Sequence, residues 1–106
     1  MSLHKSFFVA TDIQQREVEL PDGTKHILNF KELPAIEFRK FQIAEASEDE
    51  DVRISSIAKL IASSLVEPDG KLSLTLKEAL QLKGQPANAI LAAILDVNGF
   101  GKAKNA

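Results

Sequence analysis

Apolar residues change their spacing along the chain near Pro34. Before this point Val18 and Leu20 alternate with acidic residues, the period of two that is typical of a half-buried strand. After it, apolar residues recur every three or four positions, as they do on the core-facing side of a helix. This change of period predicts an α+β fold in which strands come first and helices follow.

The first part of the chain predicts a β-hairpin. Pro21-Asp22-Gly23-Thr24 has the composition of a tight turn, because Pro presets φ at the first corner and Gly supplies the positive φ that follows. Two strands flank it, residues 16–20 and 25–30. The run from Ser6 to Ala10 also favours extended structure and would add a third strand. An isolated hairpin is marginal in water, so we expect one face to lie on helices.

About four helices are expected after the hairpin. Their predicted ranges are 34–46, 48–66, 75 to 82 or 83, and one from Pro86 that is capped at Gly99. Ser47 and Thr75 each precede a Glu by three residues, the spacing of a capping box, and Gly84 is expected to end the third helix. The expected core-facing residues of the second and last helices are Ile54, Ile57, Ala58, Ile61 and Leu65, and Ile90, Leu91, Ile94, Leu95 and Val97.

Length and composition limit the classes of function. A chain of 106 residues fits a single domain, predicted over residues 1–100, followed by a loose tail at 101–106. The net charge of −2 comes without a basic stripe, which argues against nucleic-acid binding. The short apolar patch near the N-terminus is too short to span a bilayer, so no membrane is expected. The lack of Cys is consistent with the reducing cytosol.

No catalytic, cofactor or metal site is predicted. His4 and His26 lack a second ligand at helical or finger spacing. The acidic residues from Glu48 to Asp51 lack the spacing of a calcium loop, and they complement a helix dipole better than they form an ion site. We therefore expect a protein that binds other proteins and is not an enzyme.

The predicted helix 34–46 is apolar on two sides. Ile36 and Ile43 share one side, while Phe38 and Phe41 point nearly the opposite way. Either the helix is covered on both sides, or one side is exposed and binds a partner. The same two interpretations apply to the pair Phe7-Phe8. The candidate partner-binding residues are Phe7, Phe8, Ile36, Phe38 and Phe41.

Three segments carry a resemblance to a known family. They are the helix that runs into Ser64-Leu-Val-Glu-Pro-Asp-Gly-Lys71, the Leu- and Thr-rich segment with Glu78-Ala-Leu80, and the apolar helix that ends at Asn98-Gly99. In this order, after a hairpin, they resemble the small tail assembly chaperones of long-tailed, non-contractile phages of the lambda type. The resemblance covers about three-quarters of the chain.

The resemblance implies a function without catalysis. Proteins of this family act in the host cytoplasm, keep the tape measure protein soluble, help to recruit the major tail protein, and are absent from the mature virion. This chain would then coat an apolar helical partner reversibly through many weak contacts. Weak self-association is compatible with this behaviour.

The C-terminal tail contains a candidate frameshift junction. In the family, a ribosomal frameshift near the end of the gene produces a minority longer protein. Ala103-Lys104-Asn105 can be encoded as GCA AAA AAC, which contains a slippery heptamer. The region expected to carry the junction comprises Gly101, Lys102, Ala103, Lys104 and Asn105, and an ordinary Lys-containing tail is the alternative.

Two other functions remain open from the sequence. The chain could be a tail-completion or joining protein that stays in the virion, or an adaptor of host origin that links other proteins. Its presence in purified virions would favour the first, and its gene neighbourhood would identify the second.

Overall fold

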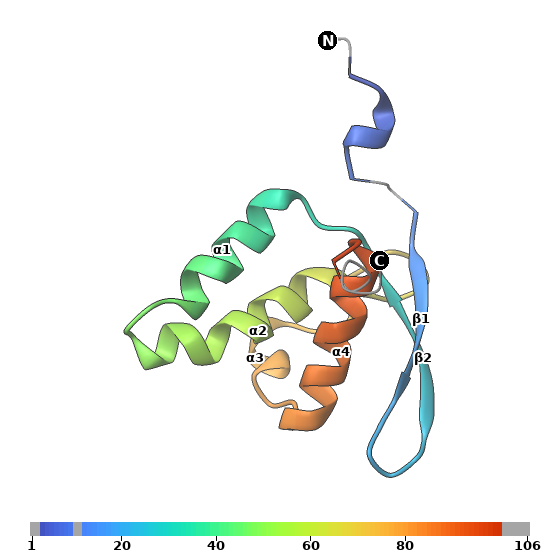
Figure 1. Cartoon of the computed structure of the whole chain (residues 1–106). Helices are drawn as coiled ribbons and strands as arrows, with labels where there is room; N and C mark the ends of the chain where they lie inside the picture. The colour runs from blue at the N-terminus through green and yellow to red at the C-terminus, as the bar shows by residue number, and fades with distance from the viewer. Residues whose placement is uncertain (1–2, 10–11, 101–106) are drawn as a thin grey trace.

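The computed structural model describes residues 3–9 and 12–100. It confirms the α+β fold: a three-stranded antiparallel sheet stands beside four α-helices (Figure 1). In chain order the elements are the 3₁₀ turn η1 (Lys5–Phe7), β1 (Gln14–Glu19), β2 (Lys25–Phe30), α1 (Ala35–Glu45), α2 (Glu50–Ser64), β3 (Leu65–Val66), α3 (Leu76–Ala79) and α4 (Gly84–Val97).

The predicted hairpin is confirmed. β1 and β2 pair antiparallel with Val18 opposite His26, and Gly23 adopts a φ of 87° in the turn between them. The Asp22 carboxylate accepts hydrogen bonds from the hydroxyl and the N–H of Thr24, at 2.6 and 2.9 Å. These bonds favour the ionised form and lower the pKa of Asp22 below its ordinary value. The turn is therefore stabilised by its own residues.

The third strand lies elsewhere than the sequence predicted. The segment from Ser6 to Val9 is not a strand, because it lies beside no strand of the described chain, and residues 5–7 form a 3₁₀ turn. Instead, Leu65 and Val66 leave the predicted end of the second helix and pair with the end of β2. The buried Ser64 hydroxyl donates to the Lys31 carbonyl at 3.0 Å and joins the two segments where the pairing begins.

The second helix also begins later than predicted. Asp49 is its N-cap, and the Asp49 carboxylate accepts from the N–H of Asp51 at 2.9 Å. The Ser47 hydroxyl accepts from the N–H of Asp49 instead of forming a capping box with Glu50. Glu50 and Asp51 still occupy the first turn, where they complement the helix dipole as expected.

For the two remaining helices, the predicted capping box is confirmed but the predicted boundary between them is wrong. Thr75 and Glu78 form the predicted capping box, with the Glu78 N–H donating to the Thr75 hydroxyl at 3.1 Å and the Thr75 N–H donating to the Glu78 carboxylate at 2.9 Å. The prediction that Gly84 ends this helix was wrong, because α3 ends at Ala79 and Gly84 begins α4. Pro86 then lies in the first turn, where its missing N–H removes no intrahelical bond.

We expect Thr75→Ala to lower the free energy of unfolding by about 1 kcal/mol, the usual effect of removing an N-cap hydroxyl. Urea denaturation would measure the change, with Lys77→Ala as the control because Lys77 is exposed in the same helix. An unchanged unfolding midpoint for Thr75→Ala would show that this cap adds nothing to stability.

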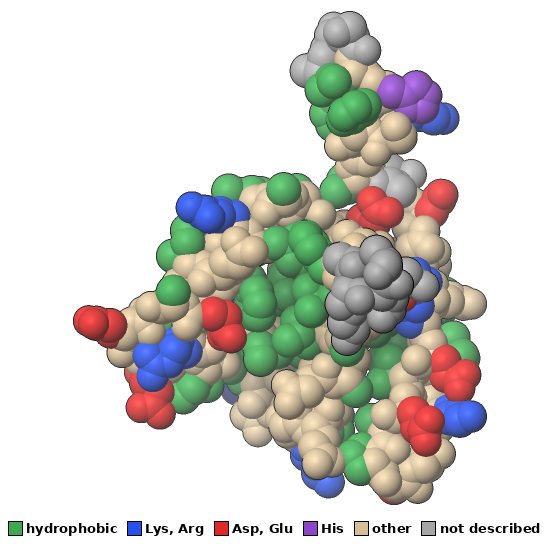
Figure 2. All heavy atoms as spheres, viewed as in Figure 1, with side chains coloured by type: hydrophobic (Ala, Val, Ile, Leu, Met, Phe, Trp, Pro, Cys, Tyr) green, Lys and Arg blue, Asp and Glu red, His purple; other side chains and the backbone are tan. Residues whose placement is uncertain are grey.

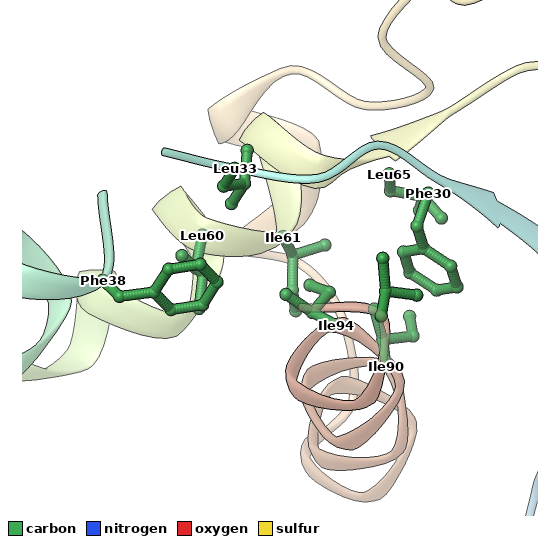
Figure 3. Close-up of a cluster of buried hydrophobic side chains, with 9 residues drawn as sticks. Phe30, Leu33, Phe38, Leu60, Ile61, Leu65, Ile90 and Ile94 are labelled. Carbon is green, nitrogen blue, oxygen red and sulfur yellow. The ribbon is translucent and has the colours of Figure 1, made fainter. Parts of the chain in front are cut away.

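The core lies where the helices meet the sheet. α4 packs on β1, α2 packs on α4, and α1 packs on α2. Figure 3 shows Ile61 and Ile94 at the centre of the cluster, with Phe38 and Leu60 on one side and Phe30 and Ile90 on the other. The guanidinium of Arg16 donates to the Asp96 carboxylate at 2.7 Å and joins β1 to α4 at the edge of this core.

The apolar stripe predicted for α2 is only partly core. Ala58, Ile61 and Leu65 are buried, but Ile54 is exposed. Leu60, which lies outside the predicted stripe, is buried against α1. α2 is covered by both α1 and α4, so its buried surface is wider than one stripe.

Candidate functional site

An apolar groove opens at the end of the molecule where α1 begins and α4 ends. The side chain of Asn98 organises this end: its amide oxygen accepts from the N–H of Leu33 at 2.9 Å, and its amide nitrogen donates to the Ile94 carbonyl at 2.8 Å. The first bond holds the segment before α1 against the end of α4, and the second fixes the Asn98 side chain on α4. Leu33 and Val97, two members of the core, lie together there as a result.

The residues after α4 form one wall of the groove. Gly99 takes a φ of 86°, and the Phe100 N–H donates to the Leu95 carbonyl at 2.8 Å, which is the pattern of a Schellman cap. This cap turns the chain back so that Phe100 lies against Phe38, with ring centroids 4.9 Å apart and the rings tilted by 55°. Phe100 stays half exposed while Phe38 is buried beneath it.

Residues 3–9, which we call the N-terminal arm, form the opposite wall. Figure 1 shows the arm projecting away from the helices. None of the residues of η1 is buried, and Phe7 is 71% exposed. The apolar side chains that the arm exposes are Leu3, Phe7, Phe8 and Val9.

The space between the arm and the body has a volume of about 450 Å³. We call it the terminal groove. Glu32 is the charged residue of its lining. The apolar residues of the lining are Phe7, Phe8, Val9, Leu33, Ala35, Phe38, Val97 and Phe100. Figure 2 shows hydrophobic side chains on the arm and gathered in the recess between α1 and α4. This surface is suited to an apolar segment of protein.

The structure brings together three of the five residues that the sequence suggested for partner binding. Phe7, Phe8 and Phe38 all line the terminal groove, but they differ in access. The arm phenylalanines are exposed, whereas the interpretation of Phe38 as an exposed docking residue was wrong, since only 6% of its surface is accessible. Phe38 faces α2 and belongs to the core, so it supports the groove from beneath.

Phe41 and Ile36 lie away from this groove. Phe41 is partly buried against the core and lines a small cavity of about 160 Å³ between α1 and α2. Ile36 is exposed on α1 together with Ile43. The helix is therefore covered on its phenylalanine side and open on its isoleucine side.

Leu33, Val97 and Phe100 were missed as groove residues. A signal for Phe100 was present, because an apolar residue that follows a Gly cap commonly packs back on the helix it terminates. Leu33 and Val97 had no comparable signal, since the hydrogen bond from the Leu33 N–H to the Asn98 side chain joins residues far apart in the sequence.

Charged residues form no recognisable ion site in the part of the chain that the structure describes. No group of three or more His, Asp or Glu residues in residues 3–9 and 12–100 could hold a metal ion. His4 and His26 are both exposed, each bonded to a nearby hydroxyl, Ser6 and Thr24 respectively. Within the same ranges, every helix is too short or too polar to cross a bilayer. The predicted frameshift region, 101–105, lies outside the described residues.

Comparison with protein-family models, with curated proteins and with solved structures gives no match for this chain.

Proposed function

We propose that this protein is a phage tail assembly chaperone without enzymatic activity, which binds the tape measure protein and keeps it soluble. The observation that carries the proposal is the exposed apolar surface at one end of the fold. Three of the six phenylalanines in the chain are exposed there and line one groove: Phe7, Phe8 and Phe100. The proposal joins this surface to the resemblance, over about three-quarters of the chain, to the chaperone family.

The terminal groove suits an apolar helical client. A groove of about 450 Å³ accommodates a few apolar side chains from one face of a helix. Such a contact is small and weak for a single copy. Many copies along one long client would still hold it, because neighbouring sites on one chain raise the effective concentration.

The family resemblance extends the proposal beyond this groove. The protein would help to recruit the major tail protein, act in the host cytoplasm, and be absent from the mature virion. A longer product made by a frameshift near codons 99–105 would supply a second binding function. Finding the chain in purified virions would instead favour a structural tail-completion or joining protein.

Co-expression with a tape measure protein tests the proposal directly. We expect the wild-type chain to increase the fraction of the tape measure protein recovered in the soluble lysate. Phe100→Asp should reduce that recovery about fivefold or more, because it places a carboxylate inside the apolar groove. Ile27→Asp is the matched control, since Ile27 is exposed on β2 outside the groove.

Two results would contradict the proposal. One is a tape measure protein that stays insoluble in the presence of the folded wild-type chain. The other is an equal loss of recovery with both variants, which would show that the added charge acts without regard to the groove. Circular dichroism of each purified variant checks that the fold is retained.

A further inference from the structure

We propose that Asn98 is a site of spontaneous deamidation, that the cap at the end of α4 slows the reaction, and that the product loosens the Phe100 wall of the terminal groove. Asn98 is followed by Gly99, and no other Asn of the chain precedes a Gly. A side chain on the following residue hinders the attack of its backbone nitrogen, and Gly has none. The reaction needs no tape measure protein, so a failure of this proposal is distinguishable from a failure of the proposed function.

The reaction uses atoms of two neighbouring residues and one water molecule. The backbone nitrogen of Gly99 attacks Cγ of Asn98 and loses its proton to solvent, while the side-chain NH₂ takes up a proton and leaves as ammonia. Water then opens the resulting five-membered imide at one of its two carbonyls. Cleavage of the new bond between nitrogen and Cγ gives aspartate, and cleavage of the original peptide bond gives isoaspartate, whose main chain continues through Cβ and Cγ. Gly99 is exposed, so solvent reaches the attacking nitrogen.

The folded chain holds the reacting atoms apart. The ψ angle of Asn98 is 10°, so the Gly99 nitrogen nearly eclipses the backbone nitrogen of Asn98. Viewed along the bond from the carbonyl carbon to Cα, Cβ then lies on the order of 120° away, because the substituents of a tetrahedral Cα are evenly spread. The imide ring closes only when the Gly99 nitrogen eclipses Cβ. Closure therefore requires a large rotation of ψ at the end of α4.

Hydrogen bonds resist this rotation. The Gly99 N–H, whose nitrogen is the nucleophile, donates to the Asp96 carbonyl at 3.1 Å. The amide that has to be attacked is held at both ends, since its oxygen accepts from the Leu33 N–H at 2.9 Å and its nitrogen donates to the Ile94 carbonyl at 2.8 Å. Deamidation of the folded chain therefore proceeds from a locally open state in which the end of α4 has unwound, and its rate follows the population of that state.

Either product disrupts the end of α4. Aspartate has no side-chain N–H, so it presents a carboxylate oxygen to the Ile94 carbonyl where the amide donated a hydrogen bond. The new negative charge lies at the C-terminal end of the helix, where the dipole disfavours it. Isoaspartate adds one carbon to the main chain and displaces the Phe100 N–H from the Leu95 carbonyl. Both changes weaken the cap that keeps Phe100 on Phe38.

Peptide mapping of the purified full chain after incubation in mildly alkaline buffer tests the site. Trypsin releases residues 84–102 as one peptide, which contains Asn98 and also Asn88, an Asn that precedes Ala89. We expect NH₂ to be replaced by OH at Asn98 much faster than at Asn88. Conversion of Asn98 in urea should be at least about tenfold faster than in the folded chain, since unfolding removes the cap. Equal rates with and without urea, or equal conversion of the two Asn residues, would overturn the proposal.

A variant of the cap tests what controls the rate. Phe100→Ala should speed the conversion of Asn98 in the folded chain at least about threefold, because the ring that packs the cap on Phe38 is lost. Phe100 is half exposed, so the variant should keep its fold, which circular dichroism checks. Ile54→Ala, exposed on α2, is the control and should convert at the wild-type rate. A wild-type rate for folded Phe100→Ala would refute control by the cap.

Tryptophan fluorescence tests the effect on the groove. The chain has no Trp, so Phe100→Trp supplies the only indole signal. Adding Asn98→Asp, which reproduces one product, should shift the emission to longer wavelength and increase its quenching by acrylamide, because the indole leaves Phe38. Asn88→Asp in the same Phe100→Trp background is the matched control, since it adds the same charge at an exposed position of α4. Equal emission and quenching in the two double variants would refute the loosening of the wall.

Discussion

Phe38→Asp is expected to unfold the domain, whereas Ile36→Asp, two residues earlier in α1, should leave it folded. Only 6% of the Phe38 surface is accessible, and its side chain lies in the core cluster beneath Phe100. An unpaired charge at such a site costs roughly 3–5 kcal/mol. Lost apolar packing adds to this, and the total is comparable with the whole stability of a small domain, about 5–15 kcal/mol. Ile36 is exposed, so a carboxylate there remains in water.

Far-UV circular dichroism and urea denaturation of both variants measure the difference. A Phe38→Asp variant with native helical content and an unchanged midpoint would contradict the placement of Phe38 in the core. The result also determines how the co-expression assay with the tape measure protein is interpreted. If Phe38→Asp fails to solubilise a partner, the cause is a lost fold, and the role of the groove has to be tested at Phe100 or on the arm.

Ile61→Ala is expected to lower the free energy of unfolding by about 2–5 kcal/mol, the range observed when a buried Ile or Leu is truncated. Ile61 is 0% exposed and lies between α1 and α4 on the inner side of α2. The change leaves a cavity because neighbours from two helices hold its walls apart. Ile54→Ala is the matched control in the same helix, about two turns earlier, where the side chain is 61% exposed.

The control should change the free energy of unfolding by no more than about 0.5 kcal/mol. Urea denaturation of the two variants, analysed with a common m-value, gives both numbers. Equal losses for Ile54→Ala and Ile61→Ala would mean that the whole predicted stripe is buried. Two small losses would mean that the space around Ile61 collapses easily, as it does in a loosely packed core.

Local sequence determined the features that depend on neighbouring residues. Both Pro-Asp-Gly segments form the same turn: Gly23 and Gly70 have φ values of 87° and 90°, and Asp22 and Asp69 each accept a hydrogen bond from the N–H two residues later. The capping box at Thr75 and the cap at Gly99 also formed as predicted. In each case the bonding partners lie within a few residues, so their meeting needs no other part of the fold.

The order of strands and helices was predictable for the same reason. Period-two and helical spacing of apolar residues each imply an element with one buried side. Periodicity tells which residues share a side, as it did for Ile36 and Ile43 against Phe38 and Phe41. It does not tell which side another element will cover.

Only the tertiary structure decided which apolar surfaces are covered. α1 buries Phe38 because its phenylalanine side meets α2, and Leu65 and Val66 become a strand because the end of β2 offers them a partner. Ile54 and the arm phenylalanines stay exposed, since no described element lies over them. Burial depends on contacts between segments far apart in the chain, and those contacts form only when the elements pack. The terminal groove, built from the arm, the start of α1 and the end of α4, is a product of that packing.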